Sequence, residues 1–211
     1  KVLYFAREKK GHEGVKGTVT EDFRGILVHD HEITFYRYGS AHQECLAHVE
    51  RYLKDSMENE SSLTWNRRMR ELLQRMIHYR KEHTGEASLD AQTAAGFETE
   101  YQEILDKAKE EYKRNEPSPY YREGYNLYRR MQEYKTEHLL FLHDMRVPTT
   151  NNTAERCLRD YKRKQTFAMT FRSLESIEEL CHSKGVLLEV RKNNPNIYTA
   201  VMEIFNRRYG A

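Results

Sequence analysis

Two carboxylates in this sequence stand where a metal-dependent reaction could use them. Asp30 follows the apolar run Ile26 to Val28, which is typical of a strand buried on both faces. Glu155 falls in the first turn of a helix that we expect from about Thr153. Divalent cations such as Mg²⁺ prefer oxygen ligands, often one or two carboxylates together with substrate phosphates. Asp30 and Glu155 are therefore candidate catalytic residues and metal ligands.

Each acid also has a purely structural explanation. Asp30 can cap the turn that follows its strand, and Glu155 can complement the dipole at the start of its helix. Position alone does not decide between these explanations and a metal site.

The helix that carries Glu155 is strongly basic beyond its first turn. Positive side chains in such a cluster can contact the phosphates of DNA, although a solvated helix face is the alternative. The two residues before the helix, Asn151 and Asn152, can either cap it or contact DNA. The candidate DNA-binding cations are Arg156, Arg159, Lys162, Arg163 and Lys164.

Two other groups resemble metal sites more weakly. Cys45 and His48 have the spacing of half a zinc site, and Cys181 with His182 could supply the rest. The second pair lacks the usual spacer, so a buried thiol beside a histidine at a helix start is the simpler interpretation. His29 and His31 flank Asp30. Because successive residues of a strand point to opposite faces, both histidines would point away from the Asp30 side chain. These three side chains cannot converge without a bend.

Composition limits the class of protein more than its function. The net charge of +2 does not by itself indicate a nucleic-acid partner, so only local clusters of charge can. Three cysteines are a small and odd number, which does not suit a disulfide framework. The sequence therefore favours a protein of the reducing cytosol. No run of about 20 apolar residues that could span a membrane is present.

The secondary structure that positions these residues changes along the chain, from mixed strands and helices to long helices. The first part reads as α/β, with strands over 2–7 and 26–28, a short helix or turn over 32–38, and a strand leading into a helix over 41–53. Helical periodicity then predicts three long helices, over 61–83, 89–112 and 121–144. After the basic helix we expect an extended segment over 166–171 and helices over 173–184 and 197–209.

Three segments together resemble a known family. The segment Asn151-Asn152-Thr153-Ala154-Glu155-Arg156-Cys157-Leu158-Arg159, followed by Lys162-Arg163-Lys164, resembles the C-terminal signature of transposases of the insertion sequence 66 family. Gly25-Ile26-Leu27-Val28-His29-Asp30 is similar to the second acidic strand of that family. Cys45-Leu46-Ala47-His48 is similar to the segment that follows it, and the three segments occur in the family's order.

The resemblance implies an α/β fold of high helix content, with a ribonuclease-H-like mixed sheet. Residues 1–60 and 145–211 would form the catalytic core, and 61–144 a helical insertion. The family's acidic triad has two aspartates and a glutamate, of which Asp30 matches the second aspartate and Glu155 the glutamate. The implied activity is DNA strand cleavage and transfer with Mg²⁺ or Mn²⁺. The implied partners are transposon ends and target DNA in the bacterial cytoplasm, in association with the nucleoid.

One departure from the family pattern leads to two expectations. The first aspartate belongs on the first strand of such a fold, whereas Asp22 lies on a loop just before the Asp30 strand. We therefore expect a fragment that lacks the first strand and one catalytic acid, and that is inactive alone. We also expect self-association through the sheet edge left open.

Two alternatives from other classes stay open. The chain can be a non-catalytic DNA- or protein-binding helical domain derived from a mobile element. It can also be a scaffold whose tyrosine-rich middle binds another protein. Metal dependence separates an enzyme from the first alternative. DNA binding that depends steeply on salt concentration separates the enzyme and the DNA-binding domain from the scaffold.

Overall fold

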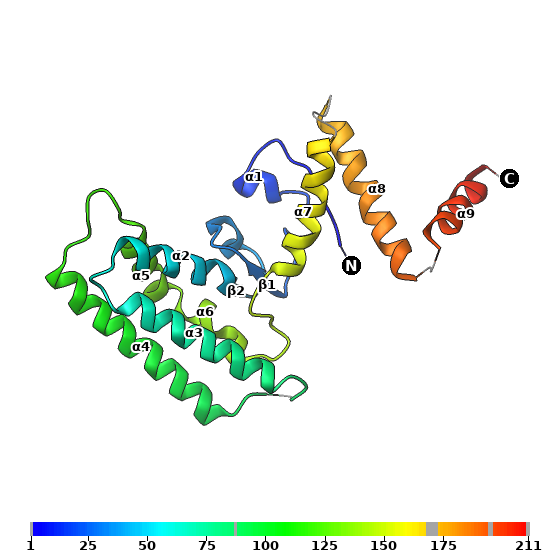
Figure 1. The fold of residues 1–211 in the computed structure, drawn as a ribbon. Coiled ribbons are helices and arrows are strands. Elements are labelled where there is room, and N and C mark those ends of the chain that lie inside the picture. The colour runs from blue at the N-terminus through cyan, green and yellow to red at the C-terminus, as the bar shows by residue number, and fades with distance from the viewer. Residues whose placement is uncertain (1, 87, 168–172, 194–195, 210–211) are drawn as a thin grey trace. The chain divides into compact units, whose positions relative to one another are not determined.

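The computed structural model describes residues 2–86, 88–167, 173–193 and 196–209 (Figure 1). It divides into two compact units. One unit comprises Phe23–Asn151, and the other comprises Lys1–Asp22 together with Asn152–Ala211. Each unit is described by itself below.

The sheet of the Phe23–Asn151 unit is a parallel pair of short strands, β1 (Ile26–His29) and β2 (Ala41–Glu44). The register places Ile26 opposite Ala41 and His29 opposite Glu44. The connection passes through the 3₁₀ helix η1 (Ile33–Arg37), and Glu32 caps it by accepting a hydrogen bond from the Thr34 N–H. These elements confirm the strand expected at 26–28 and the short helix expected at 32–38.

A glycine closes the connection between the two strands. Gly39 has a φ of 75°, a left-handed conformation that side chains rarely adopt. A Cβ at this position would also lie 2.8 Å from the Gly25 carbonyl oxygen. Gly39 therefore sets the path by which the chain enters β2.

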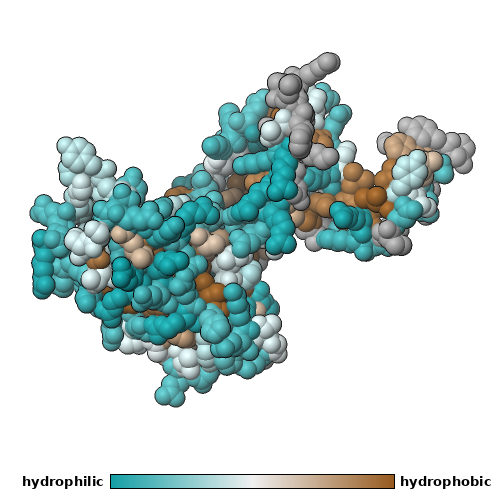
Figure 2. Space-filling view, in the orientation of Figure 1, coloured by the Kyte–Doolittle hydropathy of each residue, from teal (hydrophilic) through white to brown (hydrophobic). Residues whose placement is uncertain are grey.

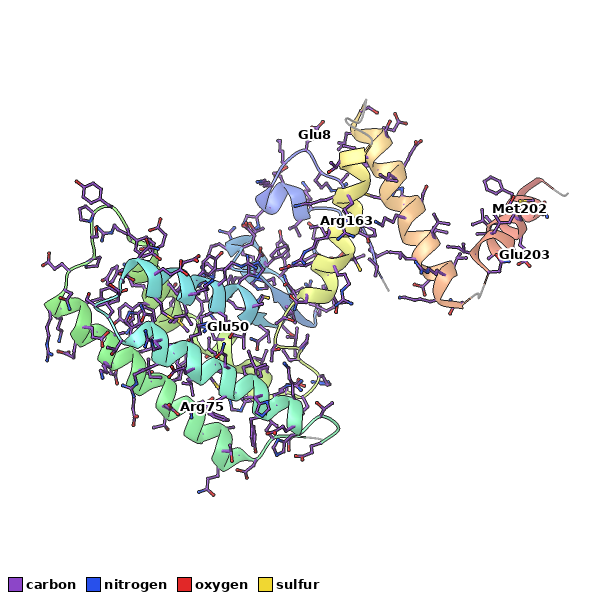
Figure 3. All side chains as sticks on the ribbon, in the orientation of Figure 1. Glu8, Glu50, Arg75, Arg163, Met202 and Glu203 are labelled. Carbon is purple, nitrogen blue, oxygen red and sulfur yellow. The ribbon has the colours of Figure 1, made fainter. Side chains whose placement is uncertain are left out.

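The described residues of this unit also form the helices α2 (Leu46–Asn59), α3 (Trp65–Glu82), α4 (Ala91–Arg114), α5 (Glu123–Glu133) and α6 (Lys135–His143). The Glu111 carboxylate on α4 accepts hydrogen bonds from the N–H groups of Thr64 and Trp65 at the start of α3. Arg75, in the middle of α3, pairs with Glu100 of α4 (Figure 3). The two helices are therefore antiparallel.

Their inward faces form one apolar core. Its largest fully buried side chains include Trp65, Met69, Tyr101 and Phe141. The helices expected at 61–83 and 89–112 are confirmed. The one expected at 121–144 is two helices, because Tyr134 leaves helical geometry at the junction of α5 and α6.

The second unit contains α1 (Gly11–Val15), α7 (Asn152–Phe167), α8 (Leu174–Asn193) and α9 (Ile197–Tyr209). The prediction of a strand at 2–7 is wrong, because these residues form no regular secondary structure. The Tyr4 hydroxyl instead donates to the Cys157 carbonyl on α7 at 3.0 Å, and Arg7 pairs with Glu178 on α8. The prediction of self-association thus loses the strand on which it was based.

The end of the chain is helical over a longer range than expected, and part of its surface is apolar. α8 continues to Asn193, beyond the range of 173–184 expected for this helix, and α9 confirms the last helix. Of the extended segment expected at 166–171, Thr166 and Phe167 end α7, and the rest lies outside the described residues. Apolar side chains gather over α8 and α9 (Figure 2), for example Val186 and Phe205. A search of the described helices finds none with the length and apolar character of a membrane span.

Candidate functional site

Asp30 lies at the carboxyl end of the parallel strands. It is the first residue after β1, and it is exposed. Its backbone carbonyl accepts the Glu32 N–H at 2.7 Å and contacts His29 Nδ1, which holds the turn after the strand. Ligands gather at the carboxyl ends of strands in open α/β sheets. The local fold thus presents Asp30 at an edge suited to chemistry.

Glu44 ends β2 at the same edge, but its carboxylate is buried. The side chain is 1% exposed, and polar groups surround both oxygens. Oε1 lies 2.5 Å from His31 Nδ1 and also accepts the Tyr36 hydroxyl. Oε2 lies 3.0 Å from His138 Nε2 and 3.6 Å from Arg130 Nε. A carboxylate withdrawn from water needs such partners to remain charged.

A second layer of contacts extends from Glu44 into the helices. Since a carboxylate only accepts, His138 Nε2 carries the proton that it donates to Glu44. His138 Nδ1 lies 2.9 Å from the Tyr101 hydroxyl, which donates to the Met131 carbonyl. His138 is fully buried on α6, Tyr101 on α4. The strand edge is therefore tied to three helices, α4, α5 and α6, by one polar network.

The neighbouring Gln43 strengthens the connection between β2 and α6. Its amide nitrogen donates to the His138 carbonyl at 3.2 Å, and its amide oxygen accepts the Phe141 N–H at 2.9 Å. Gln43 is fully buried. Together, Gln43 and Glu44 fix α6 against the end of the sheet.

The network sets the charges of its members. Burial opposes ionisation of Glu44, but hydrogen bonds from His138, His31 and Tyr36 outweigh it and hold its pKa well below the ordinary value. Burial, together with the adjacent Glu44 carboxylate, raises the pKa of Tyr36 far above its usual range. Burial also raises the pKa of Tyr101. The centre is an ionised carboxylate surrounded by donors.

A pair of histidines, one on each strand, lies next to Tyr36. His29 Nε2 lies 3.2 Å from His42 Nδ1, and His29 Nδ1 contacts the Asp30 carbonyl. Burial lowers the pKa of both imidazoles, and His29 contributes to the shift of His42. His29 and His31 lie two positions apart and therefore share a face, as the alternation of side chains along a strand predicts, and both imidazole rings lie near the Tyr36 ring.

The Cys45 thiol has a structural partner within its own unit. Cys45 caps α2, its N–H donates to the His29 carbonyl at 2.8 Å, and its Sγ accepts the Asn151 N–H at 3.5 Å. Cys181 and His182 lie on α8 in the other unit, Cys181 buried and His182 exposed. This placement of Cys45 agrees with the simpler interpretation, a buried thiol at a helix start.

The helix α7 carries the other predicted site residues. Glu155 lies in its first turn, and its carboxylate pairs with Arg159 at 2.9 Å, one turn later. The side chains of Arg156, Lys162 and Arg163 are exposed. Figure 3 labels Arg163 on this helix. Asn152 is the first residue of the helix, and the half-buried Asn151 precedes it. The side chain of Lys164 lies outside the described part of the chain.

The predicted residues thus fall into two sets. Asp30 and Asn151 belong to the Phe23–Asn151 unit, and Glu155 belongs with the basic side chains to the other. Sequence reasoning missed Glu44 and His138, the centre of the buried network. The available signal was that β2 carries three polar residues in a row, from His42 to Glu44. No local sequence pattern indicates that Glu44 and His138, 94 positions apart, form a contact.

Comparison with known proteins gives one match. No curated protein and no solved structure matches the chain. The model of a family described as the IS66 family of transposases, of the DDE type, matches residues 1–179. This match covers most of the 211 residues, including both candidate acids and the basic helix. The chain therefore belongs to the IS66 family of transposases.

Proposed function

We propose that this chain contributes two metal-binding acids and a DNA-contacting helix to metal-dependent cleavage and transfer of DNA strands during transposition. The observation that carries the proposal is the exposed Asp30 at the carboxyl end of a parallel strand. Membership of a transposase family supports the reaction class. The two-stranded parallel sheet would belong to a ribonuclease-H-like core made by 1–60 and 145–211, with 61–144 as the helical insertion.

Asp30 and Glu155 are the residues that would hold the metal. Both offer hard oxygen donors, which suit Mg²⁺ or Mn²⁺ and exclude a preference for soft metals. The bound cation would supply Lewis acidity at the phosphodiester and favour ionisation of the attacking hydroxyl. Arg159 competes for Glu155, because its guanidinium already pairs with that carboxylate at 2.9 Å.

The basic side chains of α7 would hold the DNA backbone. Exposed cations on one helix neutralise phosphates and release counterions, which gives affinity without sequence preference. Asn151 and Asn152 would contact the backbone beside them at the start of the helix. The set of DNA contacts is Asn151, Asn152, Arg156, Arg159, Lys162, Arg163 and Lys164. The protein would act on transposon ends and target DNA at the bacterial nucleoid in the cytoplasm.

A non-catalytic DNA-binding role is the second candidate. The observation that favours it is the ion pair between Glu155 and Arg159, because such a pair alone gives Glu155 a structural function. This candidate predicts salt-dependent DNA binding that metal does not influence.

Metal-directed cleavage of the polypeptide would test the proposal. Fe²⁺ can replace Mg²⁺ at oxygen sites, and with ascorbate and peroxide it cuts the chain next to its ligands. We expect cuts near residue 30 and near residue 155, both suppressed by excess Mg²⁺. Asp30→Asn should abolish both cuts, while Asp22→Asn, at the neighbouring loop acid, should leave them. Cuts that depend on only one acid would refute a shared metal.

A further inference from the structure

A recess of about 480 Å³ lies between the end of α4, the loop that follows it and the start of α5. It is far more basic than the chain as a whole. Lys109 and Lys113 line it from α4. Arg129 lines it from α5, and Arg122 lines it from the position directly before α5. Glu116 is the one acid in its lining. Nothing in the proposed reaction uses this surface.

Within the described part of the chain, one of these four cations forms an ion pair. Lys113 pairs with Glu110 at 2.6 Å. Lys109, Arg122 and Arg129 form no ion pair with any residue that the structure describes. Three like charges around one concave surface repel each other, and an anion bound among them would relieve that repulsion.

The floor of the recess is aromatic and rigid. Tyr112, Tyr125 and Tyr128 line it, with ring centroids 5.0–5.9 Å apart. The Tyr112 hydroxyl donates to the Glu60 carboxylate at 3.1 Å, which fixes its ring from behind. Tyr112 and Tyr128 are buried, whereas Tyr125 is half-buried. The floor thus offers an apolar, π-rich surface below the cations.

A further tyrosine lies in the same loop as Pro117, which lines the recess. Tyr120 is 97% exposed, so its ring packs against nothing in this unit. The loop is constrained around it by two prolines and by the hydrogen bond from the Tyr120 N–H to the Ser118 hydroxyl. The exposed ring is therefore accessible for stacking by an external base.

We propose that this recess binds single-stranded DNA, with the phosphates on Lys109, Arg122 and Arg129 and an unpaired base against Tyr125 or Tyr120. Cationic grooves lined with aromatic rings suit single strands, because bases stack on the rings while the backbone follows the cations. A duplex keeps its bases stacked inside and presents phosphates only, so it would not use the aromatic floor. The site would bind strands opened near the reaction, and it depends on neither Asp30 nor Glu155.

Fluorescence anisotropy of the full chain with a labelled oligothymidine tests the proposal. Lys109→Glu/Arg129→Glu should weaken binding by about ten-fold or more, because two phosphate contacts become repulsive. Tyr120→Ala should weaken it by about five-fold or more. All three side chains are exposed, so the fold should tolerate these changes. Binding of a duplex of the same length should change much less.

A matched control separates the recess from general charge. Lys81→Glu changes an exposed cation at the end of α3, which the antiparallel pairing with α4 places at the opposite end of the helices. It should leave oligothymidine binding nearly unchanged. Equal losses from Lys81→Glu and Lys109→Glu/Arg129→Glu would overturn the proposal.

The single tryptophan gives a second readout that α7 should not affect. Trp65 lies 6.2 Å from Tyr112 and 6.0 Å from Tyr128, ring to ring, so a ligand on the floor should alter its emission. We expect oligothymidine to change Trp65 fluorescence, in Lys162→Glu/Arg163→Glu as in the unaltered chain. Lys109→Glu/Arg129→Glu should abolish the change. A change absent from the unaltered chain, or lost only with the α7 variant, would refute binding in the recess.

Discussion

The Glu44 carboxylate accepts a hydrogen bond from His138 Nε2 at 3.0 Å, across 94 positions of the sequence. This contact joins the end of β2 to α6. It matters for the candidate site because the other Glu44 oxygen holds His31, the residue directly after Asp30. The helical part of the unit thus supports the turn that presents the proposed metal ligand.

Glu44→Gln should destabilise the protein by about 3 kcal/mol, because it leaves His138, His31 and Arg130 around a neutral amide in a buried site. Urea denaturation followed by circular dichroism measures the free energy of unfolding. Glu58→Gln is the matched control, since that exposed carboxylate pairs only with Lys54 on the same helix. Its expected effect is below about 0.5 kcal/mol. Similar losses for the two variants would show that the network contributes little.

The contribution of Glu44 should disappear in acid. Its pKa in the folded protein lies below the ordinary value of 4.5, so the unfolded chain takes up a proton first as the pH falls. The stabilisation is therefore full above about pH 5 and is progressively lost below that value. The free energies of unfolding of the unaltered chain and Glu44→Gln should converge as the pH falls. A difference that stays constant would exclude an ionised Glu44.

The helices of the core could be predicted because their signal is local. Leu72, Leu73 and Met76 recur at helical spacing on α3, and all three are buried. The apolar run before Asp30 likewise predicted β1. The break between α5 and α6 at Tyr134 escaped prediction, since no glycine or proline marks it.

The errors came from partners that local patterns do not contain. Val2 to Arg7 has the composition of a strand, but a strand needs a neighbour that supplies hydrogen bonds. In the structure this segment contacts helices instead, through Tyr4 and Arg7. The supporting network of the site was missed for the same reason, because Glu44 finds Tyr36, Arg130 and His138 only after the chain has folded.

Gly39→Ala should destabilise the protein by about 1–3 kcal/mol, because the φ of 75° strains a side chain and the added Cβ would lie 2.8 Å from the Gly25 carbonyl oxygen. Thermal and urea denaturation measure the loss. Gly96→Ala provides the opposite control, since no atom lies within 4 Å of its added Cβ on α4. That change should stabilise by about 0.5–1 kcal/mol through helix propensity. A neutral Gly39→Ala would show that the turn into β2 can relax.

Charge reversal on α7 should weaken duplex binding and reduce its salt dependence. If Lys162 and Arg163 each contact a phosphate, Lys162→Glu/Arg163→Glu lowers the slope of log K against log salt by about two. Titrations of a labelled duplex at several salt concentrations give that slope. Arg191→Glu, at an exposed position near the end of α8 in the same unit, should leave it unchanged. An unchanged slope in the α7 variant would remove these two residues from the DNA contacts.

Arg159→Gln should raise the affinity of the chain for Mn²⁺ by up to about five-fold, because the ion pair that competes with the metal for Glu155 is lost. Water proton relaxation by Mn²⁺ measures the affinity directly. Arg156→Gln removes the same charge from an exposed neighbour on α7 and controls for the general electrostatic effect, so its increase should be smaller. Glu155→Gln should reduce Mn²⁺ binding and make Arg159→Gln ineffective in the double variant. An Arg159→Gln chain that binds Mn²⁺ less tightly would mean that Arg159 orients Glu155 for the metal and does not compete with it.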